Sequence, residues 1–253
     1  MKKIGLSIVA LLCAVSLWAM PAYRGWQTKT QPDGTTIEVR QMGDEFYHYW
    51  ETRDGQMVAE QPDGTFVRSQ EPKPTSDQIK ARRNASPLKQ AGPRKERSLN
   101  KAPRGLLILV QFSDVSFNAA NDQAAFNDMM NKAGYNYNGA TGSAADYFKT
   151  QSNNAYEPVF DVVGPVTLPH NRAYYGEQGV INGYQANDMY MADFVTDATT
   201  AAEEAGCDFS LYDADNDYDV DFVYFIYAGQ GQAAGGSSET IWPHNWNLVS
   251  ALY

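Results

Sequence analysis

Five aspartates at alternate positions are the residues of this sequence best suited to chemistry. They lie in the stretch DADNDYDVD, residues 213–221, and are Asp213, Asp215, Asp217, Asp219 and Asp221. A strand would point all five carboxylates to one face, and aspartate is depleted in strands. A helix would stack three of them at i,i+4 spacing, where like charges repel. A loop around a hard cation suits the pattern better, because oxygen ligands at alternate loop positions can converge on one ion. The stretch therefore predicts a calcium site.

The spacing of these aspartates differs from that of a complete EF-hand loop. The first five ligand positions of such a loop fall on the five aspartates, and Asp219 would offer its backbone carbonyl. Tyr218 and Tyr224 stand where the EF-hand loop has its glycine and its bidentate glutamate. We therefore expect a calcium loop between a helix and a strand. A solvated acidic turn is the alternative.

Histidines are the other candidate metal ligands, and the chain has three: His48, His170 and His244. Catalytic zinc usually takes three protein ligands, commonly with two histidines one helical turn apart. The three histidines are far apart in the chain, and the sequence contains no H-E-x-x-H. We expect His48 and His244 to pack or to form hydrogen bonds, and we predict no catalytic or cofactor-binding residue from these patterns.

Other catalytic motifs are missing or incomplete. The glycines at 229, 231 and 235 do not have G-x-G-x-x-G spacing, and no G-x-S-x-G motif is present. Cys207 has no histidine near it in the sequence. A pair of carboxylates for glycoside hydrolysis remains open, since aspartate is abundant but no pair is singled out.

Charge is distributed unevenly along the chain. The 253 residues carry a net charge of −10 and are 43% hydrophobic, which is typical of a globular protein. Residues 106–253 hold 3 basic and 19 acidic side chains, whereas residues 71–105 hold 10 basic and 3 acidic ones. The acidic C-terminal part argues against nucleic acid as a partner and fits a cation-binding, secreted domain.

The N-terminus resembles a secretory signal. Residues 1–22 begin with two lysines, continue with an apolar run and end in small residues and a proline. The apolar run is shorter than the roughly 20 residues that span a membrane. We expect a secreted or cell-envelope protein with no integral membrane segment once the signal is removed. Cys207 would then be the sole cysteine, which excludes a disulfide framework.

Two folded parts joined by a linker are predicted after the signal. Residues 23–69 hold three Asp-Gly pairs between short alternating segments, which is typical of tight turns in a small antiparallel β module. Residues 70–104 are basic and rich in proline, and we expect a linker there that is either a solvated spacer or a site of trypsin-like cleavage.

Residues 105–253 show patterns of both strands and helices. The apolar run Leu106–Val110 predicts a buried strand. Ser143 followed by Asp146 predicts a capped helix start. The chain ends without a capping residue, so we expect the domain to be truncated at its C-terminus. Helices are predicted over 121–134, 141–152 and 184–206, and further strands over 157–169 and 222–229.

Several phrases, taken in order, resemble the immune-inhibitor-A-like (M6) family of secreted metalloproteases, of the Bacteroidetes type. They are GLLILVQFSD, ADYFKTQSNNAYEPVFDVVGPVTLP, YYG, DFSLYDADNDYDVDFVYFIYAGQGQAAGG and IWPHNW, spread over residues 105–246. The upstream phrases QPDGTTIEV, GDEFYHYWETRDG and DGTFV resemble the propeptide-like region that precedes the protease domain in such members.

The resemblance implies an α+β fold, with a small antiparallel β propeptide-like module before the N-terminal half of a zincin-like domain of mixed sheet and helices. It implies a zinc-dependent endopeptidase made as a zymogen that acts on proteins or peptides. In the family two histidines of H-E-x-x-H bind zinc and the glutamate acts as general base. No position of this sequence matches that motif, so Zn²⁺ is expected only in the full-length enzyme and this chain alone is expected to be inactive. The family's calcium-type loop matches at Asp213, Asp215, Asp217 and Asp221.

A non-enzymatic interpretation also remains. The chain could be a secreted, calcium-stabilised module that binds a glycan or a protein through its surface of tyrosine and tryptophan. A natural end of the reading frame at Tyr253 would favour this alternative.

Overall fold

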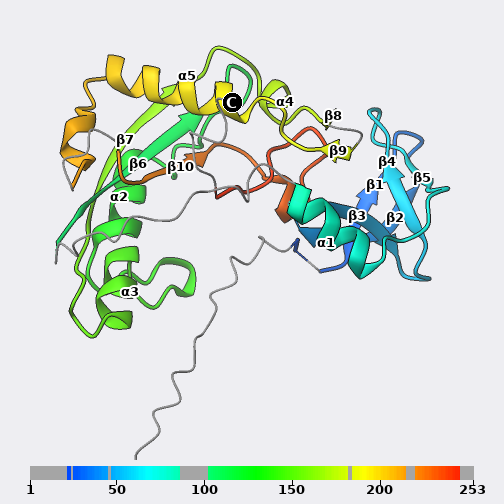
Figure 1. Ribbon diagram of the computed structural model, residues 1–253, viewed down its shortest axis with the longest axis horizontal. Helices are drawn as coiled ribbons and strands as arrows, with labels where there is room; N and C mark the ends of the chain where they lie inside the picture. The colour runs from blue at the N-terminus through cyan, green and yellow to red at the C-terminus, as the bar shows by residue number, and fades with distance from the viewer. Residues whose placement is uncertain are drawn as a thin grey trace, which may run out of the picture.

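A computed structural model describes residues 22–23, 25–44, 47–85, 102–181, 184–214 and 220–245. The described chain forms a mixed α and β structure with an antiparallel sheet at one end and a parallel sheet covered by helices at the other (Figure 1). Along the chain, no helix within these ranges is long and apolar enough to cross a membrane. The predicted α+β class is confirmed at this level.

The N-terminal sheet is a five-stranded antiparallel meander in chain order. The Asp-Gly pairs close three of its turns, where Gly34, Gly55 and Gly64 adopt φ angles of 83°, 79° and 84°. Such angles favour glycine because they lie in the left-handed region. One face carries a small core of Val39, Trp50, Val58 and Phe66. The strands are β1 Gln27–Thr30, β2 Thr36–Asp44, β3 Tyr47–Thr52, β4 Met57–Glu60 and β5 Phe66–Arg68.

A helix lies within the stretch that we predicted as linker. It is α1, Ser76–Ala85. Thr75 and Gln78 form a reciprocal cap before it: the Thr75 amide donates to Gln78 Oε1, and the Gln78 amide donates to Thr75 Oγ1. Lys73, just upstream, forms an ion pair with Glu51 of β3. The segment after the meander is thus held against the N-terminal sheet.

The second sheet has three parallel strands, β6 Arg104–Gln111, β7 Val159–Thr167 and β10 Val223–Tyr227, in the order β10-β6-β7. The central strand β6 confirms the predicted buried strand, because every residue from Leu106 to Val110 is fully buried. A strand covered on both faces reads as a continuous apolar run.

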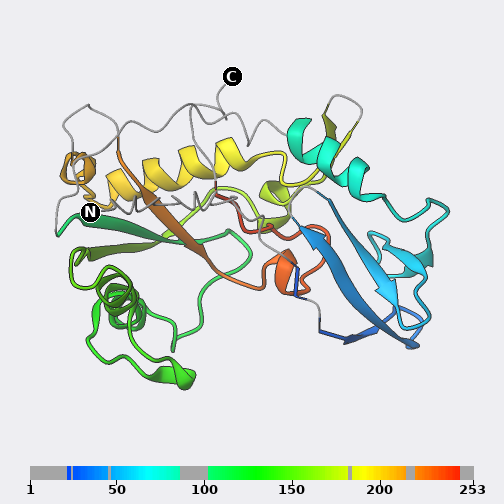
Figure 2. The same cartoon turned by 60° about the horizontal axis from the view of Figure 1, so that its bottom comes forward.

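Helices cover both faces of the parallel sheet (Figure 2). Leu106, Ile108 and Val110 pack toward α5, Met191–Glu204, in one core cluster. Leu107 and Leu109 pack on the opposite side with α2, Gln123–Asn131, and α3, Ala144–Gln151. This alternation follows the period of two of a strand. The remaining described elements are η2 Tyr137–Gly139, α4 Arg172–Tyr175, β8 Gly179–Ile181, β9 Tyr184–Ala186, η3 Phe209–Tyr212 and η4 Gln232–Ala234.

The observed start of α3 agrees with the predicted start, whereas that of α5 differs from it. Ser143 caps α3 in a full capping box with Asp146, as predicted. The predicted helix over 184–206 was wrong in its first turns, because 184–186 form β9 and α5 begins only at Met191. Asp188 lies between them with a φ of 55°, which a right-handed helix does not allow.

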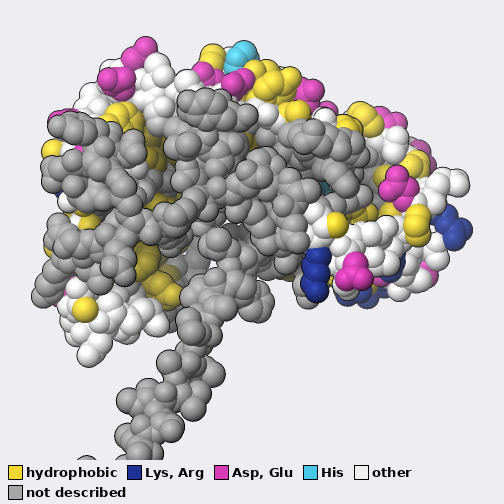
Figure 3. Space-filling model, viewed as in Figure 1, with side chains coloured by type: hydrophobic (Ala, Val, Ile, Leu, Met, Phe, Trp, Pro, Cys, Tyr) yellow, Lys and Arg dark blue, Asp and Glu magenta, His cyan; other side chains and the backbone are white. Residues whose placement is uncertain are grey.

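Surface charge differs between the two ends of the molecule. In Figure 3, among the residues shown in colour, Lys and Arg side chains are seen mainly over the N-terminal sheet, and Asp and Glu side chains follow the edge near α5.

Candidate functional site

The two sheets are connected in space by the segment that follows β10. This segment, residues 228–245, is called the junction segment below. It starts at the carboxyl ends of the parallel strands, where the Ala228 amide donates to Val110 O, and runs to the N-terminal sheet. There the Tyr23 amide donates to Ala233 O at 2.8 Å, and Lys29 Nζ of β1 donates to Gly235 O at 2.5 Å. The carboxyl edge of the parallel sheet therefore faces the N-terminal sheet.

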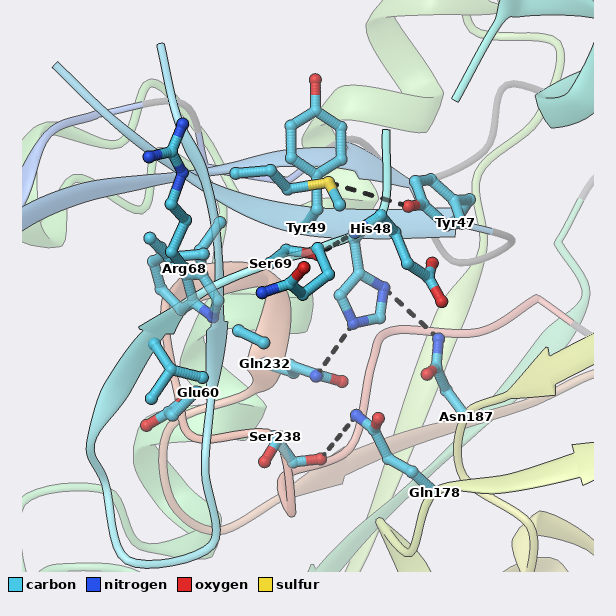
Figure 4. Close-up of a pocket in the computed structure, with 17 residues that line it drawn as sticks. Tyr47, His48, Tyr49, Glu60, Arg68, Ser69, Gln178, Asn187, Gln232 and Ser238 are labelled. Atoms are coloured by element: carbon cyan, nitrogen blue, oxygen red, sulfur yellow. Dashed lines mark hydrogen bonds between the residues drawn. The ribbon is translucent and has the colours of Figure 1, made fainter. Parts of the chain in front are cut away.

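The His48 side chain of β3 points into this junction, toward Gln232 and Asn187 (Figure 4). Its ring stacks on Trp242 with the centroids 4.3 Å apart and the planes 20° from parallel. Trp242 is fully buried and also contacts Ala22 and Ala233. Burial lowers the pKa of His48 to about 4, against smaller opposing effects of Asp44. The imidazole is therefore neutral near pH 7.

Two amide side chains from outside the N-terminal sheet face the two ring nitrogens of His48. Asn187 Nδ2 lies 3.3 Å from Nδ1, and Gln232 Nε2 lies 3.0 Å from Nε2. A neutral imidazole accepts a hydrogen bond at one nitrogen and donates from the other. Gln232 Oε1 is buried with no partner. Turning this amide would let Oε1 accept a hydrogen bond from an Nε2–H of the ring.

A buried carboxylate holds the other side of the junction segment. Asp188 Oδ2 accepts hydrogen bonds from the Trp242 amide at 3.0 Å and from His244 Nε2 at 2.7 Å. The Asp188 side chain is 0% exposed and that of His244 is 11% exposed. Asp188 therefore fixes the backbone that presents the Trp242 ring to His48.

Two neighbouring cavities open beside this contact, with volumes of about 430 and 600 Å³. They share Glu60, Gln178 and Ser238, and the second is also lined by Glu177 and Glu239. Burial raises the pKa of Glu60, and Lys29 opposes that effect. The cavities are polar, and their acidic lining disfavours anionic ligands.

The three histidines do not come together. His48 stacks on Trp242, His170 stacks on Tyr174 at 4.1 Å, and His244 bonds to Asp188. Within the described ranges, no group of three or more His, Cys, Asp or Glu side chains could hold a metal ion. The zinc that the resemblance implies therefore finds no ligand set in this part of the chain, and no catalytic step through zinc follows from it.

The aspartate loop lies at the opposite end of the parallel sheet. Asp213 follows η3, and Asp221 closes the loop: its amide donates to Tyr212 O, and its Oδ2 accepts from the Ala214 amide at 2.9 Å. Asp215, Asp217 and Asp219 lie outside the described residues. Beside the loop, Asp161 pairs with Arg104 and accepts from the Tyr212 hydroxyl. The calcium site remains a prediction, and β10 separates it from the junction.

Sequence reasoning missed the junction as a site. His48 was expected to pack or to form hydrogen bonds, as it does, but nothing in the sequence pointed to Trp242, Gln232 or Asn187 as its partners. Asp188 was assigned to a helix interior. The one available signal was Asn187-Asp188 itself, because Asn and Asp are the residues that most often leave helical geometry for positive φ.

Comparison with known proteins gives the family. A model of the immune inhibitor A peptidase M6 catalytic domain matches residues 97–252. Immune inhibitor A of Bacillus thuringiensis subsp. alesti is 30% identical over 118 residues, which cover 40% of this chain and 17% of that relative. The match thus spans less than a fifth of the relative's length. Since the family model covers more than half of the chain, the protein belongs to the immune inhibitor A (M6) peptidase family.

Proposed function

We propose that this chain is part of a secreted, zinc-dependent endopeptidase that hydrolyses peptide bonds in proteins. The observation that carries the proposal is the match of residues 97–252 to the catalytic domain of the M6 peptidases. The 253-residue chain itself is proposed to be inactive, because its sequence holds no H-E-x-x-H and the described residues assemble no zinc ligands. The signal-like residues 1–22 support export.

The N-terminal sheet is proposed to be a propeptide-like module that accompanies the protease domain. Its docking at the carboxyl edge of the parallel sheet supports this role, because ligands of open α/β sheets bind at that edge. The boundaries 23–69, 70–104 and 105–253 belong to this proposal.

Casein cleavage tests the peptidase proposal. The purified 253-residue chain, supplied with Zn²⁺, is expected to release no casein fragments, because it lacks the residues that would hold the metal. The gene product read beyond the codon for Tyr253 is expected to contain H-E-x-x-H and to cleave casein in a chelator-sensitive way. Chelator-sensitive cleavage by the short chain would refute its inactivity. A longer product without the motif would favour the alternative of a glycan- or protein-binding module.

Calcium is proposed to bind the loop 213–221 through its alternate carboxylates. Titration calorimetry is expected to show binding by the wild-type chain and none by Asp213→Ala or Asp215→Ala. At calcium concentrations of 100 times the Kd, binding should add about 2.7 kcal/mol to the free energy of unfolding. Asp128→Ala, an exposed aspartate of α2, is the matched control and should bind as the wild type does. Equal heats from all four proteins would mean that the loop is an acidic turn.

A further inference from the structure

We propose that the contact between His48 and Trp242 is an acid-labile latch, which releases the N-terminal sheet from the junction segment when His48 takes up a proton. This proposal concerns the docking of the N-terminal sheet and does not depend on the proposed peptidase function. Its test needs no catalytic activity, so refuting the latch would leave the peptidase proposal untouched, and refuting the peptidase proposal would leave the latch untouched.

The burial of His48 depends on docking. The ring belongs to β3 of the N-terminal sheet, whereas Trp242, Gln232 and Asn187 all come from the described residues beyond 101, which are called the protease part below. Separation of the two parts would return the ring to water. Its pKa would then approach the ordinary value of about 6.5. Proton uptake and docking are therefore linked.

The docked surroundings favour the neutral ring. The imidazolium ion donates from both nitrogens and accepts at neither. With Gln232 Oε1 turned toward Nε2, the Asn187 NH₂ group, 3.3 Å from Nδ1, would lose its acceptor on protonation. Asn187 and Gln232 carry no charge to compensate the proton. Trp242 would attract the cation through its ring face, but the lowered pKa means that loss of hydration is the larger effect.

Charged groups around the ring come from both parts of the molecule. On the N-terminal side, Asp44 attracts the proton weakly, and Glu60 lines the same cavity. On the protease side, Asp188 and His244 lie behind Trp242 and are bonded to each other. Glu60 acts in the opposite direction to His48, because its raised pKa makes docking stronger on acidification.

The sign and size of the effect follow from linkage. Between pH 6.5 and pH 4 the undocked chain binds more protons at His48 than the docked chain does. The contribution of His48 to docking is therefore full above about pH 6.5 and is lost as the pH falls through this window toward pH 4. With pKa values of about 4 docked and about 6.5 free, docking should be roughly 30-fold weaker at pH 5 than above pH 7.

Hydrogen exchange of the full 253-residue chain, with residues 1–22 retained so that Tyr23 keeps its backbone amide, measures this directly. The Tyr23 amide, which donates to Ala233 O across the interface, reports opening of the latch, and the amides of buried β6 report whether the protease part stays folded. After correction for intrinsic exchange rates, opening at Tyr23 should rise roughly 20-fold from pH 7 to pH 5. Protection of β6 should stay constant.

His48→Gln is the test variant, because glutamine keeps hydrogen-bonding capacity but does not titrate. It should lose the rise in opening at Tyr23 on acidification, whereas His170→Gln, which alters a histidine stacked on Tyr174 outside the junction, should keep that rise. Glu60→Gln removes the opposing effect and should steepen the response. If His48→Gln keeps the wild-type dependence, or the wild type shows none, the latch is refuted.

A direct titration covers the case in which His48→Gln does not fold. In the wild-type chain, NMR of the three histidine rings should place one midpoint between about pH 4 and pH 6.5, with the shifts of Tyr23 and Trp242 following it. A His48 midpoint near 6.5 without undocking would overturn the proposal.

Discussion

Replacing Trp242 by alanine is expected to detach the N-terminal sheet from the junction segment while both sheets stay folded. Trp242 is fully buried, and its contacts with His48 and Ala22 cross the interface, whereas Ala233 belongs to the junction segment itself. Truncation of a buried tryptophan costs about 3–5 kcal/mol. If about 3 kcal/mol of that loss falls on docking, the docking equilibrium weakens more than 100-fold. Exchange at the Tyr23 amide, with β6 as reference, measures the change.

Trp26→Ala is the matched control, because Trp26 lies on the N-terminal sheet but outside the junction. Its ring is held between Arg40 and Arg53, at 4.8 and 4.6 Å from the guanidinium carbons. Losing two exposed cation–π contacts should cost about 1–2 kcal/mol within the N-terminal sheet and leave docking unchanged. Equal protection of Tyr23 in Trp242→Ala and wild type would show that the ring does not hold the two parts together.

Local patterns predicted most of the secondary structure. The run Leu106–Val110 is a central parallel strand, and such strands are apolar on both faces. The Ser143–Asp146 box and the Asp-Gly turns depend on residues within four positions of each other, so their signal is in the sequence itself. The start of α1 had a similar signal in Thr75 and Gln78, which the basic, proline-rich composition obscured.

The junction could not be predicted in the same way, because its contacts join residues far apart in the chain. His48 and Gln232 are 184 positions apart, and His48 and Asn187 are 139 apart. Each looks ordinary in its own neighbourhood. The start of α5 failed for a related reason: the positive φ of Asp188 is stabilised by Trp242 and His244, which follow it by more than 50 residues.

The two candidate sites occupy opposite ends of β10, and this placement separates their roles. The aspartate loop leads into Val223, and the junction segment begins just after Tyr227. Calcium at the loop would brace the amino ends of the strands through the Asp161, Arg104 and Tyr212 contacts. Loss of calcium should therefore lower the stability of the parallel sheet without changing the pH response at Tyr23.

Asp188→Ala is expected to lower the free energy of unfolding by about 3–5 kcal/mol at pH 7. The change leaves the buried Trp242 amide without its acceptor, which costs about 1–3 kcal/mol, and removes the bond to His244. Alanine is also disfavoured at the φ of 55° by about 1–2 kcal/mol. Urea unfolding followed by circular dichroism measures the total.

Asp188→Asn separates these contributions. Asparagine tolerates a positive φ and can still accept from the Trp242 amide, so only the charge on the bond to His244 is lost. We expect a loss of about 1–2 kcal/mol, consistent with a charged hydrogen bond becoming a neutral one. Asp128→Ala, which removes an exposed i,i+4 ion pair with Lys132, should change stability by no more than about 0.5 kcal/mol. Equal losses for Asn and Ala at 188 would mean that the charge, rather than the backbone at this turn, holds Trp242 in place.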